Sequence, residues 1–140
     1  MSWYLRVLRH YVDFGGRARR MEFWMFALIN FLITVVLMIP VIFAVVAHPP
    51  NNNDTQWVVS FQNAAIPLNL YSLVVFLPSL AVQVRRLHDI GKSGWWYFIV
   101  FVPFAGALIL LIFNCIDSEP GSNQWGGNPK DPQVVAAVPA

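Results

Sequence analysis

Three long runs of this sequence carry no Asp, Glu, Lys, Arg or His, and each is long enough to cross a lipid bilayer. The runs cover residues 23–47, 66–84 and 95–116. As α-helices they are about 37, 28 and 33 Å long, compared with a hydrocarbon core about 30 Å thick. A chain of 140 residues that is 57% hydrophobic and 15% aromatic is also too apolar for a soluble domain of that length. The sequence therefore predicts an all-α membrane protein with three transmembrane helices.

The basic residues indicate how these helices are oriented. Five of the nine Lys and Arg residues precede the first run, none lies between the first two, three lie between the second and third, and one follows the third. Cytoplasmic segments of membrane proteins are enriched in Lys and Arg. If each run crosses the membrane, the N-terminus and residues 85–94 are cytoplasmic, and the C-terminus is periplasmic.

The ends of the chain have their own patterns. Residues 2–13 predict a short amphipathic interfacial helix, because apolar and basic residues fall on opposite faces at helical spacing. Gly15 and Gly16 then predict a sharp corner before the first span. We expect residues 1–132 to form a single integral membrane domain and residues 133–140 to be a disordered tail.

Three segments resemble a known family. They read FGGRARRMEFW at residues 14–24, RRLHDIGKSGWW at residues 85–96 and PGSNQWGGNP at residues 120–129. They are similar to the signature blocks of the YhaH-like family of small bacterial inner-membrane proteins, domain of unknown function 805. The resemblance implies a multi-pass protein of the bacterial inner membrane with no assigned activity. Trp125 and Asn128 stand where the family pattern has Tyr and Asp, so any role of that acidic residue is absent from this chain.

Charged residues gather in two of these segments, on the predicted cytoplasmic side. One interpretation is structural, with Glu22 and Asp89 paired with arginines from both segments. A second is an anion site in which arginines and backbone N–H groups bind the phosphate of an anionic lipid. A third makes His88 and Asp89 an acid–base pair. The candidate residues are Arg17, Arg19, Arg20, Glu22, Arg85, Arg86, His88, Asp89 and Lys92.

The predicted spans contain polar but no acidic residues. A proton-coupled carrier normally has an ionisable group within the membrane, so this absence argues against a proton-driven pump. The amides and hydroxyls are expected to hydrogen-bond between helices. These residues are Asn30, Thr34, Asn69, Ser72, Ser79, Gln83 and Asn114. Pro103 is interpreted as a kink within the third span, and Ala105, Gly106 and Ala107 as a place of close helix approach.

Other functional classes have little support in the sequence. The histidines are scattered and Cys115 is the only cysteine, so we predict no metal site and no cofactor. We expect no catalytic residues and no nucleic-acid partner. The main hypothesis is a non-enzymatic protein that binds anionic lipid headgroups or a membrane partner through its basic cytoplasmic face. The alternatives are a small channel or carrier built as a homo-oligomer, and a membrane enzyme acting on a lipid phosphate.

Overall fold

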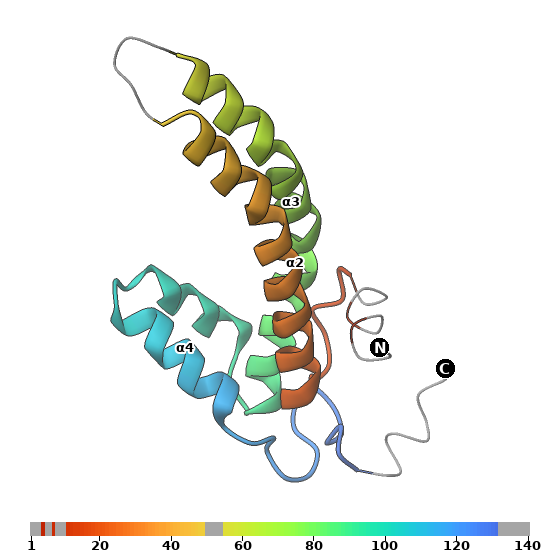
Figure 1. Ribbon diagram of the computed structural model, residues 1–140. Coiled ribbons are helices and arrows are strands. Elements are labelled where there is room, and N and C mark those ends of the chain that lie inside the picture. The colour runs from red at the N-terminus through yellow and green to blue at the C-terminus, as the bar shows by residue number, and fades with distance from the viewer. Residues whose placement is uncertain (1–3, 5–6, 8–10, 50–54, 132–140) are drawn as a thin grey trace. The chain divides into compact units, whose positions relative to one another are not determined.

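The described part of the chain is helical, as the sequence predicts. The computed structural model describes Tyr4, Val7 and residues 11–49 and 55–131. Its elements are α2 (Arg20–Ala47), α3 (Gln56–Asp89), the 3₁₀ helix η1 (Gly94–Phe101) and α4 (Ala105–Cys115), shown in Figure 1. Most of the predicted interfacial helix at residues 2–13, and the predicted tail at residues 133–140, lie outside the described residues.

Two of the predicted spans are confirmed as long apolar helices. Residues 23–47 lie within α2, and residues 66–84 lie within α3. At about 1.5 Å per residue, these helices are about 42 and 51 Å long, which exceeds the hydrocarbon thickness of a bilayer. Most of their apolar side chains are exposed, as expected of surfaces covered by lipid rather than by a protein core.

The chain forms two compact units. The central unit, Ala27–Phe76, contains parts of α2 and α3. There, Tyr71 donates a hydrogen bond from its hydroxyl to the side-chain oxygen of Asn30. The small residues Ala44 and Ala65 are buried. A polar contact between the two helices therefore exists where the sequence predicts one, at Asn30.

The terminal unit combines Met1–Phe26 with Leu77–Ala140. Its buried apolar cluster consists of Val7, Ala18, Phe26 and Val82, with Tyr4 stacked on Phe26 at 5.5 Å between ring centres. The backbone N–H of Ala18 donates to the carbonyl of Arg85 at 3.1 Å. These contacts fix the start of α2 against the end of α3, where the charged residues lie.

The third predicted span is not confirmed as one helix. Residues 95–116 are divided between η1 and α4, which are separated by Val102, Pro103 and Phe104. Proline disfavours the helical conformation in the residue before it, and Val102 is extended, with φ −79° and ψ 111°. Phe104 has φ +63°, so the chain reverses direction there. Pro103 therefore lies in a break between two helices, whereas the sequence predicted a kink within one continuous helix.

The two arms of this helical hairpin pack closely. A Cβ on Gly106 would lie 1.9 Å from the carbonyl oxygen of Ile99, so only glycine fits. Trp96 and Phe113 make an edge-to-face contact with ring centres 5.8 Å apart. The close approach predicted at Gly106 is therefore present, and it joins two arms of one hairpin.

Candidate functional site

Arg17 lies at the centre of the polar contacts in the terminal unit. The corner before it is possible because Gly16 adopts φ +73°. The side chain of Arg17 is 1% exposed, and its Nε donates to Oδ1 of Asp89 at 3.0 Å. Its two terminal nitrogens donate to backbone carbonyls of Asp89, Glu119 and Gly121, at 3.2, 2.5 and 2.7 Å. This guanidinium is fully engaged within the protein.

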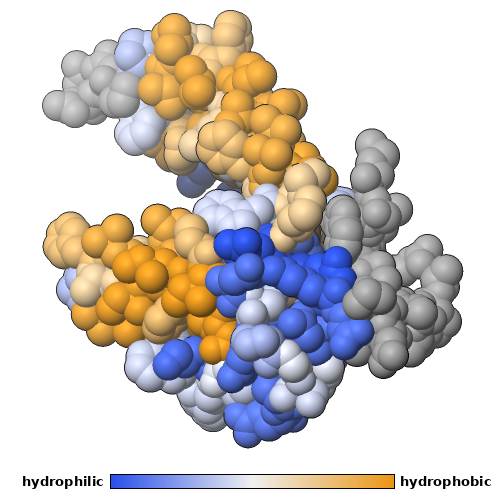
Figure 2. Space-filling view, turned by 90° about the horizontal axis from the view of Figure 1, so that it is seen from below, coloured by the Kyte–Doolittle hydropathy of each residue, from blue (hydrophilic) through white to orange (hydrophobic). Residues whose placement is uncertain are grey.

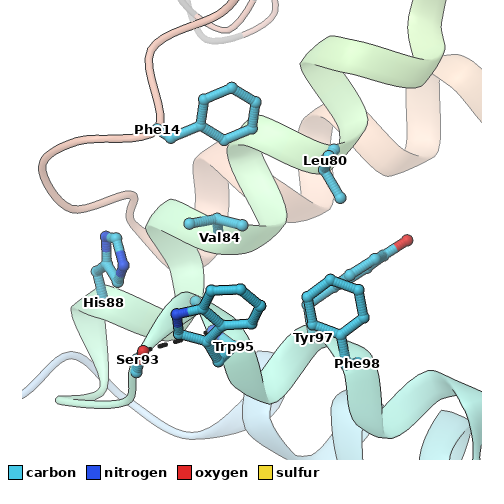
Figure 3. A pocket seen from close by; sticks show the side chains of 9 residues that line it. Phe14, Leu80, Val84, His88, Ser93, Trp95, Tyr97 and Phe98 are labelled. Carbon is cyan, nitrogen blue, oxygen red and sulfur yellow. Dashed lines mark hydrogen bonds between the residues drawn. The ribbon is translucent and has the colours of Figure 1, made fainter.

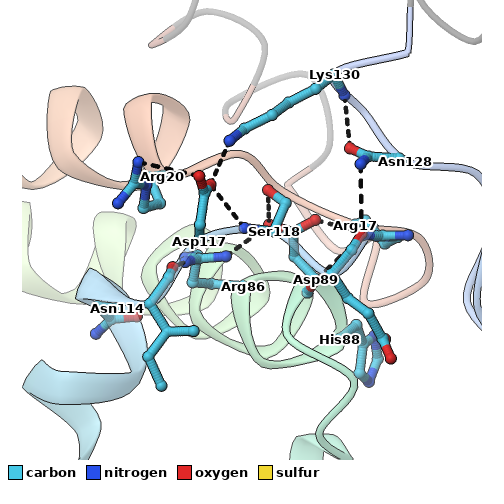
Figure 4. Close-up of polar contacts among 12 residues, drawn as sticks. Arg17, Arg20, Arg86, His88, Asp89, Asn114, Asp117, Ser118, Asn128 and Lys130 are labelled. Atoms are coloured by element: carbon cyan, nitrogen blue, oxygen red, sulfur yellow. Dashed lines mark hydrogen bonds and ion pairs between the residues drawn. The ribbon is translucent and has the colours of Figure 1, made fainter. Parts of the chain in front are cut away.

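Asp89 is buried and accepts from three side chains. Besides Arg17, Arg86 donates to Oδ2 at 2.6 Å, and the Ser118 hydroxyl donates to the same oxygen at 2.5 Å (Figure 4). Asp89 is the last residue of α3, where the helix dipole disfavours an anion. The two guanidinium groups compensate for that position. We call Arg17, Arg86, Asp89 and Ser118 the charge cluster.

A second buried pair lies beside the charge cluster. Nη2 of Arg85 lies 3.4 Å from Oε1 of Glu22, and each side chain is 5% exposed. The expected pairing of the two acidic residues with arginines from both charged segments is therefore confirmed. Glu22 pairs with Arg85. Asp89 pairs with Arg17 and Arg86.

The remaining basic residues that the structure describes are more exposed. Arg20 lies 3.4 Å from Asp117 and donates to the carbonyl of Cys115 at 3.0 Å, while Lys130 also pairs with Asp117. The hydrogen bond from Lys130 lowers the pKa of the Asp117 carboxyl below its ordinary value. Arg19 and Lys92 are partly exposed, and the Lys92 ammonium lies 5.4 Å from the ring centre of Trp96.

Residues 117–131 contact the end of α3 directly. The side-chain amide of Asn123 donates to the carbonyl of His88 at 2.9 Å. The rings of Trp125 and His88 stack with centres 4.5 Å apart and planes 6° apart. These contacts, with those of Arg17 and Ser118, dock residues 117–131 on the C-terminal end of α3. The predicted placement of these segments on opposite sides of the membrane depends on residues 95–116 crossing once as a single helix, and that helix is not confirmed.

A groove opens beside His88 in the same unit. Its volume is about 450 Å³, and its walls are mainly aromatic and aliphatic (Figure 3). His88 and Ser93 give it a polar end. His88 is 8% exposed, and its Nδ1 has no hydrogen-bond partner among the described residues. The lining residues are Phe14, Leu80, Val84, His88, Ser93, Gly94, Trp95, Tyr97 and Phe98.

Three residues of the C-terminal segment complete this site and were not predicted from the sequence. Ser118, Asn123 and Trp125 all contact it, yet they were assigned to the opposite side of the membrane. The turn-rich sequence at 120–129 was the available signal, since a stretch rich in Gly and Asn that includes a Trp suits an ordered loop packed on a surface. Within the described residues, no three His, Cys, Asp or Glu side chains are grouped as a metal site would require.

Comparison with known proteins decides the family. A family model described as "Protein of unknown function (DUF805)" matches residues 11–127, which include the whole charge cluster and Trp125. The chain belongs to the DUF805 family. Two of its relatives in Escherichia coli strain K12 are inner membrane protein YhaH, 42% identical over 133 residues, and inner membrane protein YhaI, 42% identical over 130 residues. The matches cover 93% of this chain and 98% and 97% of the relatives.

No solved structure matches this DUF805 chain. The two long apolar helices and the two relatives agree on the location of the protein. It is a multi-pass protein of the inner membrane.

Proposed function

We propose that this inner-membrane protein works without catalysis, by binding one anionic phospholipid in the groove beside His88. The observation that carries the proposal is the groove itself, which joins an apolar wall to a polar end. An acyl chain fits against Leu80 and Phe98, while His88 and Ser93 offer hydrogen-bonding groups to the ester and phosphate region. Lys92, next in sequence to Ser93, supplies the positive charge that selects an anionic headgroup.

The charge cluster has a supporting role in this proposal. Arg17, Arg85 and Arg86 are all nearly inaccessible and face carboxylates of the same chain. Such groups are poor ligands for a lipid phosphate, because binding it would break buried ion pairs. The arginines therefore hold the end of α3 and the C-terminal segment in the shape that forms the groove.

A non-catalytic role fits the contacts of the proposed acid–base pair. Both side-chain oxygens of Asp89 accept hydrogen bonds from Arg17, Arg86 or Ser118. None of these donors is His88, so the carboxylate is engaged elsewhere. His88 instead stacks on Trp125 and lines the groove.

We place the groove on the cytoplasmic side. Because residues 117–131 contact the 85–94 segment, Lys130 joins the other basic residues on that side. With this placement, all nine Lys and Arg residues lie on the cytoplasmic side of the membrane. None of them lies in the segment that connects α2 to α3. This distribution satisfies the positive-inside rule more fully than a periplasmic C-terminus would.

Native mass spectrometry tests the proposal. The purified protein should retain phosphatidylglycerol in preference to phosphatidylcholine. Leu80→Trp, which fills the groove, should abolish retention, and Lys92→Gln should remove the preference for the anionic lipid. Leu73→Trp, at an exposed apolar position of the central unit, should retain lipid as the unmodified protein does.

A melting curve for each variant separates loss of binding from loss of folding. If Leu80→Trp melts normally and still retains phosphatidylglycerol, the groove is not the binding site. Equal retention of both lipids by the unmodified protein would contradict selection by Lys92.

A further inference from the structure

The hairpin formed by η1 and α4 is too short to cross a bilayer in either arm. Eight residues of 3₁₀ helix extend about 16 Å, at about 2 Å per residue. Eleven residues of α-helix also extend about 16 Å. Each arm therefore matches about half of the 30 Å hydrocarbon core, which is the thickness of one leaflet.

The outer surface of the hairpin is apolar. Residues 94–116 include no charged side chain. Trp95 and Phe101 are each 77% exposed, and Phe104 at the reversal is 93% exposed. Figure 2 shows this as a continuous hydrophobic area beside hydrophilic residues of the same unit. So large an exposed apolar surface requires a covering partner.

The polar backbone at the reversal is hydrogen-bonded locally. The N–H of Ala105 donates to the carbonyl of Pro103 at 2.7 Å, which closes a three-residue turn around Phe104. The N–H of Gly106 donates to Val102 at 2.9 Å, and Pro103 has no N–H to satisfy. This arrangement suits a lipid environment, where no water is available to replace missing hydrogen bonds.

Both ends of the hairpin return to the polar residues of the same unit. The first arm begins at Ser93, whose hydroxyl accepts from the N–H of Trp95 at 3.4 Å. The second arm ends where the carbonyl of Ile116 accepts from Arg86 and the hydroxyl of Ser118 donates to Asp89. Gln83 and Asn114 add two reciprocal side-chain hydrogen bonds, at 3.0 and 3.2 Å, between α3 and α4.

We infer that residues 94–116 form a re-entrant hairpin embedded in a single leaflet, with Phe104 near the middle of the bilayer. The acyl chains of the leaflet next to the charge cluster cover its exposed aromatic surface. The protein then has two transmembrane helices, α2 and α3, and one hairpin that enters and leaves on the side of the charge cluster. This inference is independent of lipid binding in the groove.

Single-cysteine labelling in membrane vesicles tests the inference. Cys115 is the only cysteine, so a Cys115→Ser background accepts Lys92→Cys, Phe104→Cys or Gln124→Cys. A membrane-impermeant maleimide should label positions 92 and 124 from the same side and position 104 from neither. A bimane dye attached to position 104 through a permeant reagent should be quenched more strongly by 12-doxyl than by 5-doxyl lipid.

Three results would overturn the inference. Labelling of positions 92 and 124 from opposite sides would make residues 95–116 a spanning helix. Labelling of position 104 by the impermeant reagent would place the turn in water. Weak quenching by both lipids, with disulfide-linked dimers of Phe104→Cys, would show that a second copy covers the hairpin.

Discussion

Asp89 is the residue on which most contacts of the charge cluster depend. Its buried carboxylate balances two buried guanidinium groups at a helix end that disfavours negative charge. Removal of one partner from a buried ion pair leaves the other charged group without compensation. The structure therefore assigns Asp89 a role in stability that is larger than that of any exposed pair nearby.

Asp89→Asn should destabilise the protein strongly. The change keeps the size of the side chain but leaves Arg17 and Arg86 without their anion, so we expect a loss of about 3–5 kcal/mol in the free energy of unfolding. Asp117→Asn is the matched control, because the Asp117 side chain is 56% exposed and exposed ion pairs add little to stability. Unfolding in mixed micelles measures both. Similar losses for the two variants would contradict the assignment.

Residue types and charges were enough to predict which acidic side chains are paired, but not all of their partners. Glu22 and Asp89 are the acidic residues of the two charged segments, and both are paired with arginines as expected. Ser118 was not predicted as a partner of Asp89, because a contact 29 residues apart depends on the path of the chain between them. That path is set by the reversal at Phe104.

At the scale of elements, the main difference from the sequence prediction is the third apolar run. Its length and freedom from charge are equally consistent with one spanning helix and with two short arms. The distinction comes from Pro103, which keeps Val102 extended, and from Gly106, which allows the arms to meet. From the sequence alone, a kink explains Pro103 as well as a helix break does. In the same way, an approach by another helix explains Gly106 as well as contact between two arms of a hairpin does.

Gly106→Val should open the hairpin. The new Cβ would overlap the carbonyl of Ile99, so the arms must separate and lose their packing. We expect a loss of at least about 1–3 kcal/mol, as for other overpacked sites. Ala107→Val, at an exposed neighbouring position, should change stability little. The comparison is made by thermal unfolding in detergent, and equal melting of the two variants would contradict the close approach at Gly106.

At the scale of the whole molecule, the C-terminal segment, residues 117–131, is docked on the end of α3. Arg17 connects this segment to Asp89, and Trp125 stacks on His88. Docking explains why the single basic residue after the third run, Lys130, lies with the others. It also links the shape of the groove to residues about 30 positions further along the chain.

Cross-linking in native membranes tests this claim most directly. His88→Cys combined with Trp125→Cys, in a Cys115→Ser background, should give an intramolecular cross-link with a short thiol-reactive reagent, because the native rings are stacked. Each single-cysteine variant is a control, and adding Arg17→Gln should lower the yield by releasing the segment. A high yield with Arg17 present is the predicted result. No cross-link in the double-cysteine protein, with both thiols reactive from opposite sides of the membrane, would contradict the account.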